Sequence, residues 1–190
     1  YKKTLDAFAP YLDGESAADA RILLFPGFVC TWENGQSGLL GRNGSDFSAA
    51  IVAVGLRAAK VEFWTDVDGI FTADPRIVSD AVLVDDMSYE EAMELSFFGS
   101  KVLYPKTLAP LSARGIEAWS LNSHNPSSRG TRIGVGPFPS NAAVRGITCL
   151  KNTAMISVSG SGLKDKHGIA ARIFAAVARS GISMLLITQS

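Results

Sequence analysis

Apolar residues along the chain fall either in short continuous runs or at the spacing of one helix face, and the two patterns alternate. The runs predict strands at 21–29, 60–67 and 116–122. The helical spacing predicts helices at 47–59, 88–95 and 105–115. Strands that alternate with helices in this way indicate an α/β fold with a mainly parallel sheet.

Single residues mark where several of these elements begin and end. The Pro-Gly pair at 26–27 forces a turn just past the first strand, and Ser45 or Asp46 is placed to cap the helix that follows. Gly55 inside that helix costs about 1 kcal/mol relative to alanine, which indicates close packing against a neighbour. Ser88 and Glu91 have the spacing of a capping box, so another helix should begin there.

The last third of the chain has a different pattern. A polar loop at 123–134 leads to a predicted edge strand, and residues 136–141 have the composition of a linker. Beyond the linker we predict a strand at 154–160, a helix at 169–181 and an apolar strand at 182–190. Ile169, Ile173 and Val177 form an apolar stripe on this helix. Gly181 stands where a C-terminal cap is expected. A β-α-β unit this small cannot bury a core alone and suggests half of a ferredoxin-like module.

Composition narrows the class of protein. The chain has 190 residues, 47% of them hydrophobic, and 18 basic residues balance 18 acidic ones. These values fit a soluble globular protein and give no reason to expect nucleic acid or a membrane as a partner. Cys30 and Cys149 have no ligand-like spacing, so we expect buried thiols in a reducing cytoplasm. Leu5, Phe8 and Leu12 lie on one helical face, as if the chain began partway through a helix, and the last residues lie inside a predicted apolar strand. We therefore expect a fragment of a longer protein.

The segment "GRNGSD" (41–46) is the first candidate for chemistry. Its glycines allow a ligand to approach the backbone, the following helix offers free N–H groups, and Arg42 suits a carboxylate or phosphate. Asp46 would oppose a bare anion but suits a ligand that also carries an ammonium group. An ordinary strand-to-helix turn, with Arg42 solvated and Asp46 capping, explains this stretch equally well. The segment does not match a P-loop.

The segment "WTDVDGIFTADPR" (64–76) is the second candidate. Asp66 and Asp68 follow a strand end, where ligands gather in open α/β sheets. Apolar neighbours argue that the loop is partly buried rather than fully solvated. His124 and His167 have no convincing nucleophile beside them, which makes a hydrolytic triad improbable. Phosphoryl transfer to a carboxylate needs no base, because that acceptor is already deprotonated at neutral pH.

Four segments together resemble the aspartate kinase family, in particular its threonine-sensitive type fused to homoserine dehydrogenase. They are "GRNGSDFSAA", "WTDVDGIFTADPR", "SYEEAMELSFFGSKVLYP" and "MISVSGSG…ITQS". The resemblance implies an α/β fold: the C-terminal half of an amino-acid-kinase fold, with a mainly parallel sheet and helices on both faces, followed by a partial ACT module. The kinase domain would occupy residues 1–138 and the ACT regulatory domain residues 139–190.

The resemblance also implies a reaction and residues to perform it. The ATP γ-phosphoryl group would pass to the β-carboxylate of L-aspartate, with Mg²⁺ bridging the phosphates and control by an amino-acid effector, threonine in this type. The substrate would be bound by Arg42, Gly44, Ser45 and Asp46, with Asp46 as the catalytic residue. The nucleotide would be contacted by Thr65, Asp66, Phe71, Arg76, Lys101 and Val102, and the effector by Gln189. ACT modules would join the protein into a homodimer or larger homo-oligomer.

Two alternatives stay open. The family's N-terminal Lys-Phe-Gly-Gly segment is absent here, so the catalytic site is incomplete and this stretch alone should lack kinase activity. It could then serve as a non-catalytic module for amino-acid sensing or dimerisation. The fold could also belong to a sibling kinase that acts on glutamate, acetylglutamate or uridylate.

Overall fold

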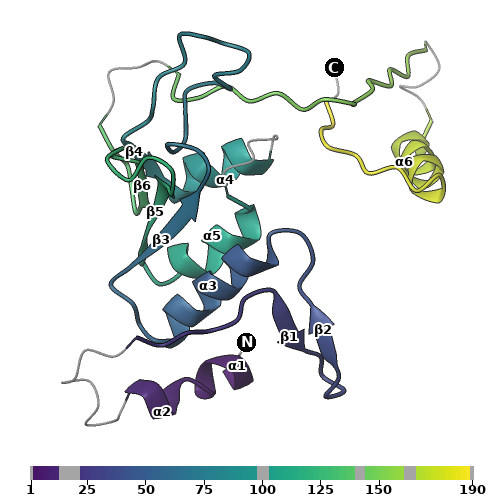
Figure 1. Cartoon of the computed structure of the whole chain (residues 1–190). Helices are drawn as coiled ribbons and strands as arrows, with labels where there is room; N and C mark the ends of the chain where they lie inside the picture. Colours follow the sequence, from purple (N-terminus) through teal and green to yellow (C-terminus); the bar gives the residue numbers. More distant parts are fainter. Residues whose placement is uncertain (1, 13–21, 98–102, 140–143, 161–165, 189–190) are drawn as a thin grey trace. The chain divides into compact units, whose positions relative to one another are not determined.

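The computed structural model describes residues 2–12, 22–97, 103–139, 144–160 and 166–188 (Figure 1). The chain divides into two compact units, Tyr1–Lys151 and Asn152–Ser190. The domain boundary after residue 138 stays a prediction.

Unit 1 is built on a four-stranded sheet with the order β3-β5-β6-β4. β3 (Lys60–Thr65) pairs in parallel with β5 (Glu117–Asn122), and β4 (Asp86–Ser88) pairs in parallel with β6 (Thr131–Gly134). The two pairs join through antiparallel β5 and β6. The mainly parallel sheet is therefore confirmed. The strand associated with the polar loop at 123–134 is β6, and the prediction that it lies at an edge was wrong, because the three-residue β4 lies outside it.

Three helices form a layer against this sheet: α3 (Gly44–Gly55), α5 (Pro105–Ser112) and α4 (Tyr89–Phe97). α5 packs between α3 and α4, and each helix also contacts a strand, so the three cover the same face of the sheet. Side chains of β3 alternate between buried and exposed, as expected when one face is covered. The resemblance implied helices on both faces. Among the described residues, the helices in contact with the sheet are on one face.

The buried core lies between this helix layer and the sheet. Its fully buried members include Met87, Leu108, Leu111, Ala118 and Ile133. Burying one large aliphatic side chain contributes roughly 1.5–3 kcal/mol, so this interface holds unit 1 together.

The predicted close packing of Gly55 is confirmed. A Cβ atom there would lie 2.2 Å from Cδ2 of Phe8. Phe8 lies between two short helices, α1 (Lys2–Asp6) and α2 (Ala9–Leu12), where the pattern predicted one. Pro10 explains the break, since its ring cannot donate a hydrogen bond to the carbonyl of Asp6 and clashes with it.

The strand predicted at 21–29 was wrong. Residues 22–27 form neither strand nor helix, and Ile22 and Leu24 are 96% and 94% exposed. The segment pairs with none of the described strands, and the outer side of β3 in the sheet is left without a neighbour among them. A hairpin that was not predicted follows instead, formed by β1 (Val29–Thr31) and β2 (Ser37–Leu39).

The capping box at the start of α4 is confirmed by two reciprocal hydrogen bonds. The backbone N–H of Ser88 donates to Glu91 Oε2 at 2.8 Å, and the N–H of Glu91 donates to Ser88 Oγ at 3.1 Å. Two of the helix's orphan donors are thereby satisfied.

Unit 2 contains α6 (Ile169–Arg179), and the predicted apolar stripe and C-terminal cap are confirmed. Ile169, Ile173 and Val177 are half-buried on an otherwise exposed helix. At its end Gly181 has φ +68°, and the amides of residues 181 and 182 bond the carbonyls of residues 178 and 177 as in a Schellman motif. The strands predicted at 154–160 and 182–188 are not formed. Nothing described in unit 2 pairs with them, and an unpaired strand leaves its backbone groups unsatisfied.

Both cysteines are free thiols, but the prediction that they are buried was wrong: Cys30 is half-buried and Cys149 is exposed. Throughout the ranges that the structure describes, the helices are too short or too polar to cross a membrane.

Candidate functional site

At the first turn of α3 the backbone passes very close to neighbouring side chains. Gly41 and Asn43 adopt left-handed conformations, with φ of +80° and +57°. A Cβ atom on Gly44 would lie 2.7 Å from Cβ of Leu40 and 3.0 Å from the ring of Phe28, so only glycine fits there. The glycines of "GRNGSD" are thus required by the turn itself.

Ser48 fixes a second segment against this turn. Its Oγ accepts a hydrogen bond from the N–H of Phe28 at 3.1 Å and donates to the carbonyl of Gly44 at 2.9 Å. The carbonyl of Phe28 in turn accepts from the N–H of Leu40 at 2.9 Å. The helix start is therefore clamped by the loop at residues 27–28, a partnership that the sequence analysis missed.

The N-cap of α3 is Asn43, so the prediction that Ser45 or Asp46 caps this helix was wrong. Asn43 adopts a left-handed conformation directly before the first helical residue, and its side chain makes no capping hydrogen bond. The N–H of Gly44 bonds the carbonyl of Gly41, and that of Phe47 bonds the carbonyl of Asn43. The amides of Ser45 and Asp46 have no backbone acceptor among the described residues. Such amides, with the positive end of the helix dipole, form an anion-binding position.

The two charged residues of this turn differ in environment. Arg42 is exposed, whereas Asp46 is half-buried. Burial raises the pKa of the Asp46 carboxyl, and a hydrogen bond with the Ser45 side chain opposes that rise. A carboxylate that has lost water without gaining a cation is suited to a positively charged ligand group.

The loop after β3 begins at Thr65 and is tied to the residues that follow β5. The carbonyl of Thr65 accepts hydrogen bonds from the N–H and the Oγ of Ser123, both at 2.9 Å. Asp68 Oδ1 accepts from the side-chain amides of Asn122 and Asn125 at 2.8 and 3.0 Å. Asp68 thus has a structural role. The exposed Asp66 is left as the acid that can face a ligand.

A bidentate ion pair closes the loop. Arg76 donates from Nη2 to Asp74 Oδ2 at 2.8 Å and from Nε to Asp74 Oδ1 at 3.0 Å. These bonds lower the pKa of Asp74 to about 2, and the charges of Asp74 and Asp66 both help to raise the pKa of Arg76. The guanidinium is exposed and has five N–H donors, so donors remain for a second anion.

Phe71 is half-buried at the start of a long excursion between β3 and β4. It forms an isolated bridge with Leu83, and the N–H of Thr72 donates to the carbonyl of Val82 at 2.9 Å. The excursion is therefore folded back on itself, with Phe71 held near its base.

Both candidate loops lie at one edge of the sheet. α3 is joined to β3 by a short turn and packs against it, so the helix runs back along the strand (Figure 1). The N-terminus of α3, with Arg42 and Asp46, is consequently at the same edge as the C-terminus of β3, with Thr65 and Asp66. β5 is parallel to β3 with Asn122 opposite Thr65, so the carboxyl end of β5 lies there too.

Three of the predicted site residues, Lys101, Val102 and Gln189, lie outside the described residues. His124 and His167 are exposed, in loops far apart along the chain. The described residues contain no group of three or more His, Cys, Asp or Glu side chains that could hold a metal ion. The anchoring residues Asn122, Asn125 and Thr131 were missed, although a polar residue that ends a strand parallel to β3 was a usable signal.

Comparison with known proteins places this geometry in context. Residues 6–122 match the amino acid kinase family, and residues 156–190 match an ACT domain. The bifunctional aspartokinase/homoserine dehydrogenase of Haemophilus influenzae is 47% identical over 94% of the chain, which covers 22% of that protein. The chain thus spans about a fifth of the length of the bifunctional relatives that it matches.

Two solved aspartate kinase structures are similar to this chain. Escherichia coli aspartokinase III, in complex with aspartate and ADP, matches 86% of the chain with a TM-score of 0.66 and 34% identity, over 36% of its own length. The aspartate kinase of Clostridium acetobutylicum matches 93% of the chain with a TM-score of 0.78 and 27% identity, over 41% of its own length.

Proposed function

The chain belongs to the amino acid kinase family, and we propose that it is part of an aspartate kinase, which transfers the ATP γ-phosphoryl group to the β-carboxylate of L-aspartate to give 4-phospho-L-aspartate. The predicted resemblance to aspartate kinases and the predicted fold class are confirmed by the family match and by the relatives. The observation that supports the proposed activity is that the loop before α3 and the loop after β3, both suited to anions, lie at the same edge of the sheet.

The α3 loop suits the amino-acid substrate. Arg42 and the amides of Ser45 and Asp46 offer donors to a carboxylate. Asp46 offers the opposite charge to an α-ammonium group, and an ammonium ligand would offset the desolvation that raises the pKa of Asp46. A ligand with both charges therefore fits this turn better than a bare phosphate does.

The loop after β3 suits the nucleotide. Phe71 offers an apolar surface, Arg76 has donors beyond those that bind Asp74, and Thr65 and Asp66 lie at the strand end. E. coli aspartokinase III was solved in complex with aspartate and ADP, which supports proposing the same two kinds of ligand for this protein.

Mg²⁺ would be bound mainly by the phosphates, because it keeps waters and needs few protein ligands. The donor set fits that role, since the described residues offer isolated carboxylates such as Asp66 rather than a metal-binding cluster. The ion would neutralise charge on the transferred group. Arg42 and the α3 amides would hold the acceptor carboxylate in line with it, and no residue need remove a proton from an acceptor with a pKa near 4.

Regulation is the second part of the proposal. The ACT match at 156–190 supports binding of an amino-acid effector, for which we propose threonine, with Gln189 as a contact. E. coli aspartokinase III has been solved with lysine, so lysine is the competing effector. We further propose a homo-oligomer joined through ACT modules, located in the cytoplasm. Calorimetry of the full-length protein with threonine and with lysine distinguishes the two effectors.

The activity is tested on the full-length protein by trapping the acyl phosphate as a hydroxamate. We expect aspartate- and ATP-dependent product, with glutamate and acetylglutamate as the substrates that would indicate a sibling kinase. Arg42→Ala and Asp46→Ala should each lower kcat/KM by about 30- to 100-fold, the loss of one charge-assisted contact. Arg129→Gln, which changes an exposed arginine near Asp85, is the control. Unchanged turnover in both loop variants would refute the site.

A further inference from the structure

We infer that Arg145 is a positioning residue, which clamps the segment 144–151 onto α4 and, through it, steadies the loop after β3 that carries Phe71 and Arg76. The inference rests on the proposed function for its kinetic consequence only. The clamp itself is a feature of unit 1.

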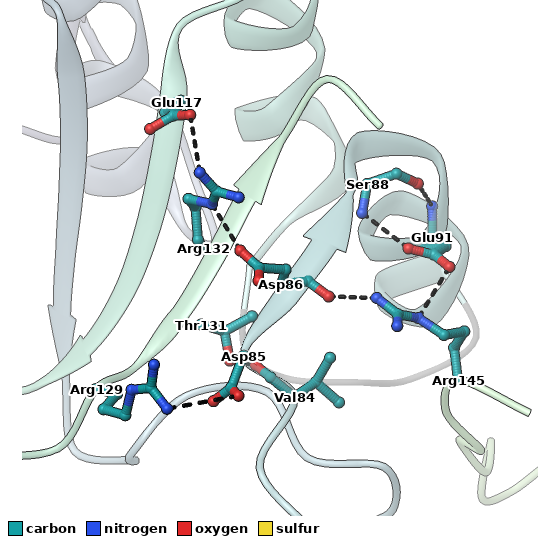
Figure 2. A network of polar contacts seen from close by, with 10 residues as sticks. All are labelled: Val84, Asp85, Asp86, Ser88, Glu91, Glu117, Arg129, Thr131, Arg132 and Arg145. Atoms are coloured by element: carbon teal, nitrogen blue, oxygen red, sulfur yellow. Dashed lines mark hydrogen bonds and ion pairs between the residues drawn. The ribbon is translucent and has the colours of Figure 1, made fainter. Parts of the chain in front are cut away.

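Arg145 binds the start of α4 in two ways (Figure 2). Its Nε lies 3.1 Å from Glu91 Oε1, and its Nη2 donates to the backbone carbonyl of Asp86. The other oxygen of Glu91 accepts from the N–H of Ser88, so one carboxylate serves both the capping box and the clamp. The Arg145 side chain is only 23% exposed, and a charge pair so shielded is screened less than a surface pair.

The segment after Arg145 then reaches the loop after β3. The N–H of Ile147 donates to the carbonyl of Thr72 at 2.8 Å. A Cβ atom on Gly146 would lie 3.0 Å from Cδ1 of Leu95, so the backbone passes close to α4 here. The charge of Lys151 also contributes to the low pKa of Asp74, the partner of Arg76. One short segment therefore touches both the helix start and the loop assigned to the nucleotide.

A groove of about 610 Å³ lies between α4 and the segment. It is lined by Glu91, Glu94 and Leu95 on the helix and by Arg145, Gly146, Ile147, Thr148 and Leu150 on the segment. Arg145 bonds the start of α4 beside this open space, so the loss of the arginine should loosen the segment and weaken the Ile147–Thr72 hydrogen bond.

Figure 2 also shows Arg132 and Arg129, which contact other parts of unit 1. Arg132 bonds Asp86 Oδ1 at 2.6 Å and lies 3.5 Å from Glu117, so it joins strands of the sheet. Arg129 lies 3.8 Å from Asp85, and both side chains are largely exposed. Arg145 alone among these three belongs to the segment that leads directly to unit 2, which begins at Asn152. A displacement that entered this segment from residue 152 would reach the Ile147–Thr72 hydrogen bond first and Arg145 next.

The test uses the full-length protein and the variants Arg145→Gln and Glu91→Gln. Glutamine at position 91 can still complete the capping box, so the second variant removes the charge pair without removing the cap. Arg129→Gln is the matched control. The first readout is hydrogen exchange without ligands, in peptides that cover 70–84 and 144–151. Loss of a charge-assisted contact should speed exchange there by about tenfold in both variants and not in the control.

The second readout separates positioning from general stability. We expect KM for ATP to rise about three- to tenfold in both variants while kcat stays within about twofold, because the loop that binds the nucleotide is loosened and the acceptor site is not. Unchanged exchange in both variants would overturn the clamp. Faster exchange with an unchanged KM would overturn its link to the nucleotide loop. If the wild-type protein makes no acyl phosphate, the proposed function fails, and hydrogen exchange still decides the clamp. If Arg145→Gln fails to fold, Glu91→Gln decides it.

Discussion

The hydroxyl of Thr131 joins three segments of unit 1 that are distant in sequence. Thr131 lies in β6 and is fully buried. Its Oγ1 accepts a hydrogen bond from the N–H of Ile70 at 2.8 Å and donates to the carbonyl of Val84 at 2.7 Å. Ile70 belongs to the loop after β3, and Val84 lies two residues before β4. Replacing Thr131 with valine keeps the side-chain shape and removes both hydrogen bonds.

The cost can be worked from these contacts. Leaving a buried polar group without a partner costs about 1–3 kcal/mol, and Thr131→Val does so to the N–H of Ile70 and the carbonyl of Val84. The valine methyl recovers about 1 kcal/mol, because a buried hydroxyl is replaced by an apolar group. The expected loss is therefore about 3 kcal/mol of unfolding free energy. Thr131→Ser keeps the hydroxyl and removes one methyl, which costs about 1 kcal/mol.

Urea unfolding followed by tryptophan fluorescence measures this difference. The three tryptophans, at positions 32, 64 and 119, all lie in unit 1, so the signal reports that unit. Thr131→Val should lower the midpoint more than Thr131→Ser, with the slope of the transition unchanged. The opposite order would show that Thr131 acts through its methyl packing, and the reasoning about hydrogen bonds would be refuted.

Three further substitutions test the packing, a helix end and a buried phenol. Gly55→Ala should lower the free energy of unfolding by about 1–2 kcal/mol, although alanine has the better helix propensity, because its Cβ would clash with Phe8. In a Phe8→Ala background the same substitution should be neutral or stabilising. A double-mutant cycle measured by urea unfolding tests both expectations. Arg57→Gly should stabilise by about 0.5–1 kcal/mol because Arg57 has φ +51°, and a lower thermal midpoint would contradict this. Tyr89 donates to the carbonyl of Ile116, and burial raises its pKa to about 12. Wild-type stability should therefore fall from pH 10 to 12, where only the unfolded state ionises, and Tyr89→Phe should show no such fall in pH-dependent unfolding.

Features of the fold that depend on neighbouring residues could be predicted from the sequence. The capping box of Ser88 and Glu91 and the Schellman end at Gly181 each involve residues within one or two turns of a helix. Gly55 is different, because its partner Phe8 is far away in sequence. The glycine still marks the contact, since it is costly in a helix unless something must pass close by.

Features that depend on strand order could not be predicted in the same way. The edge position expected for the strand that became β6 was wrong because its outer neighbour, β4, has three residues and almost no sequence pattern of its own. The expected strands at 21–29, 154–160 and 182–188 are apolar enough, but a strand also needs a partner, and a run of apolar residues does not say which segment supplies it.

The candidate site shows the same division. The positions of Arg42, Asp46, Thr65 and Asp66 at strand and helix ends could be predicted, because such ends meet at one edge of a parallel sheet. The separate roles of the residues within the loop after β3 could not be predicted. Asp68 resembles Asp66 in the sequence, yet Asp68 accepts hydrogen bonds from Asn122 at the end of β5 and from Asn125 just beyond it.

The loop after β3 combines firm anchoring with exposed charge, and this combination is what a nucleotide site requires. Its base is held by Thr131 in β6, Asp68 by a side chain at the end of β5, and the Thr72 carbonyl by the N–H of Ile147. Arg76 and Asp66 remain exposed between these anchors. Anchoring removes conformational freedom before the ligand arrives, so less binding energy is lost in ordering the loop. Of these anchors, Ile147 belongs to the segment that leads to unit 2. If the two loops have the proposed roles, a signal that travelled along the chain from residue 152 would reach the proposed nucleotide loop through Ile147 before it reached the proposed acceptor site at α3.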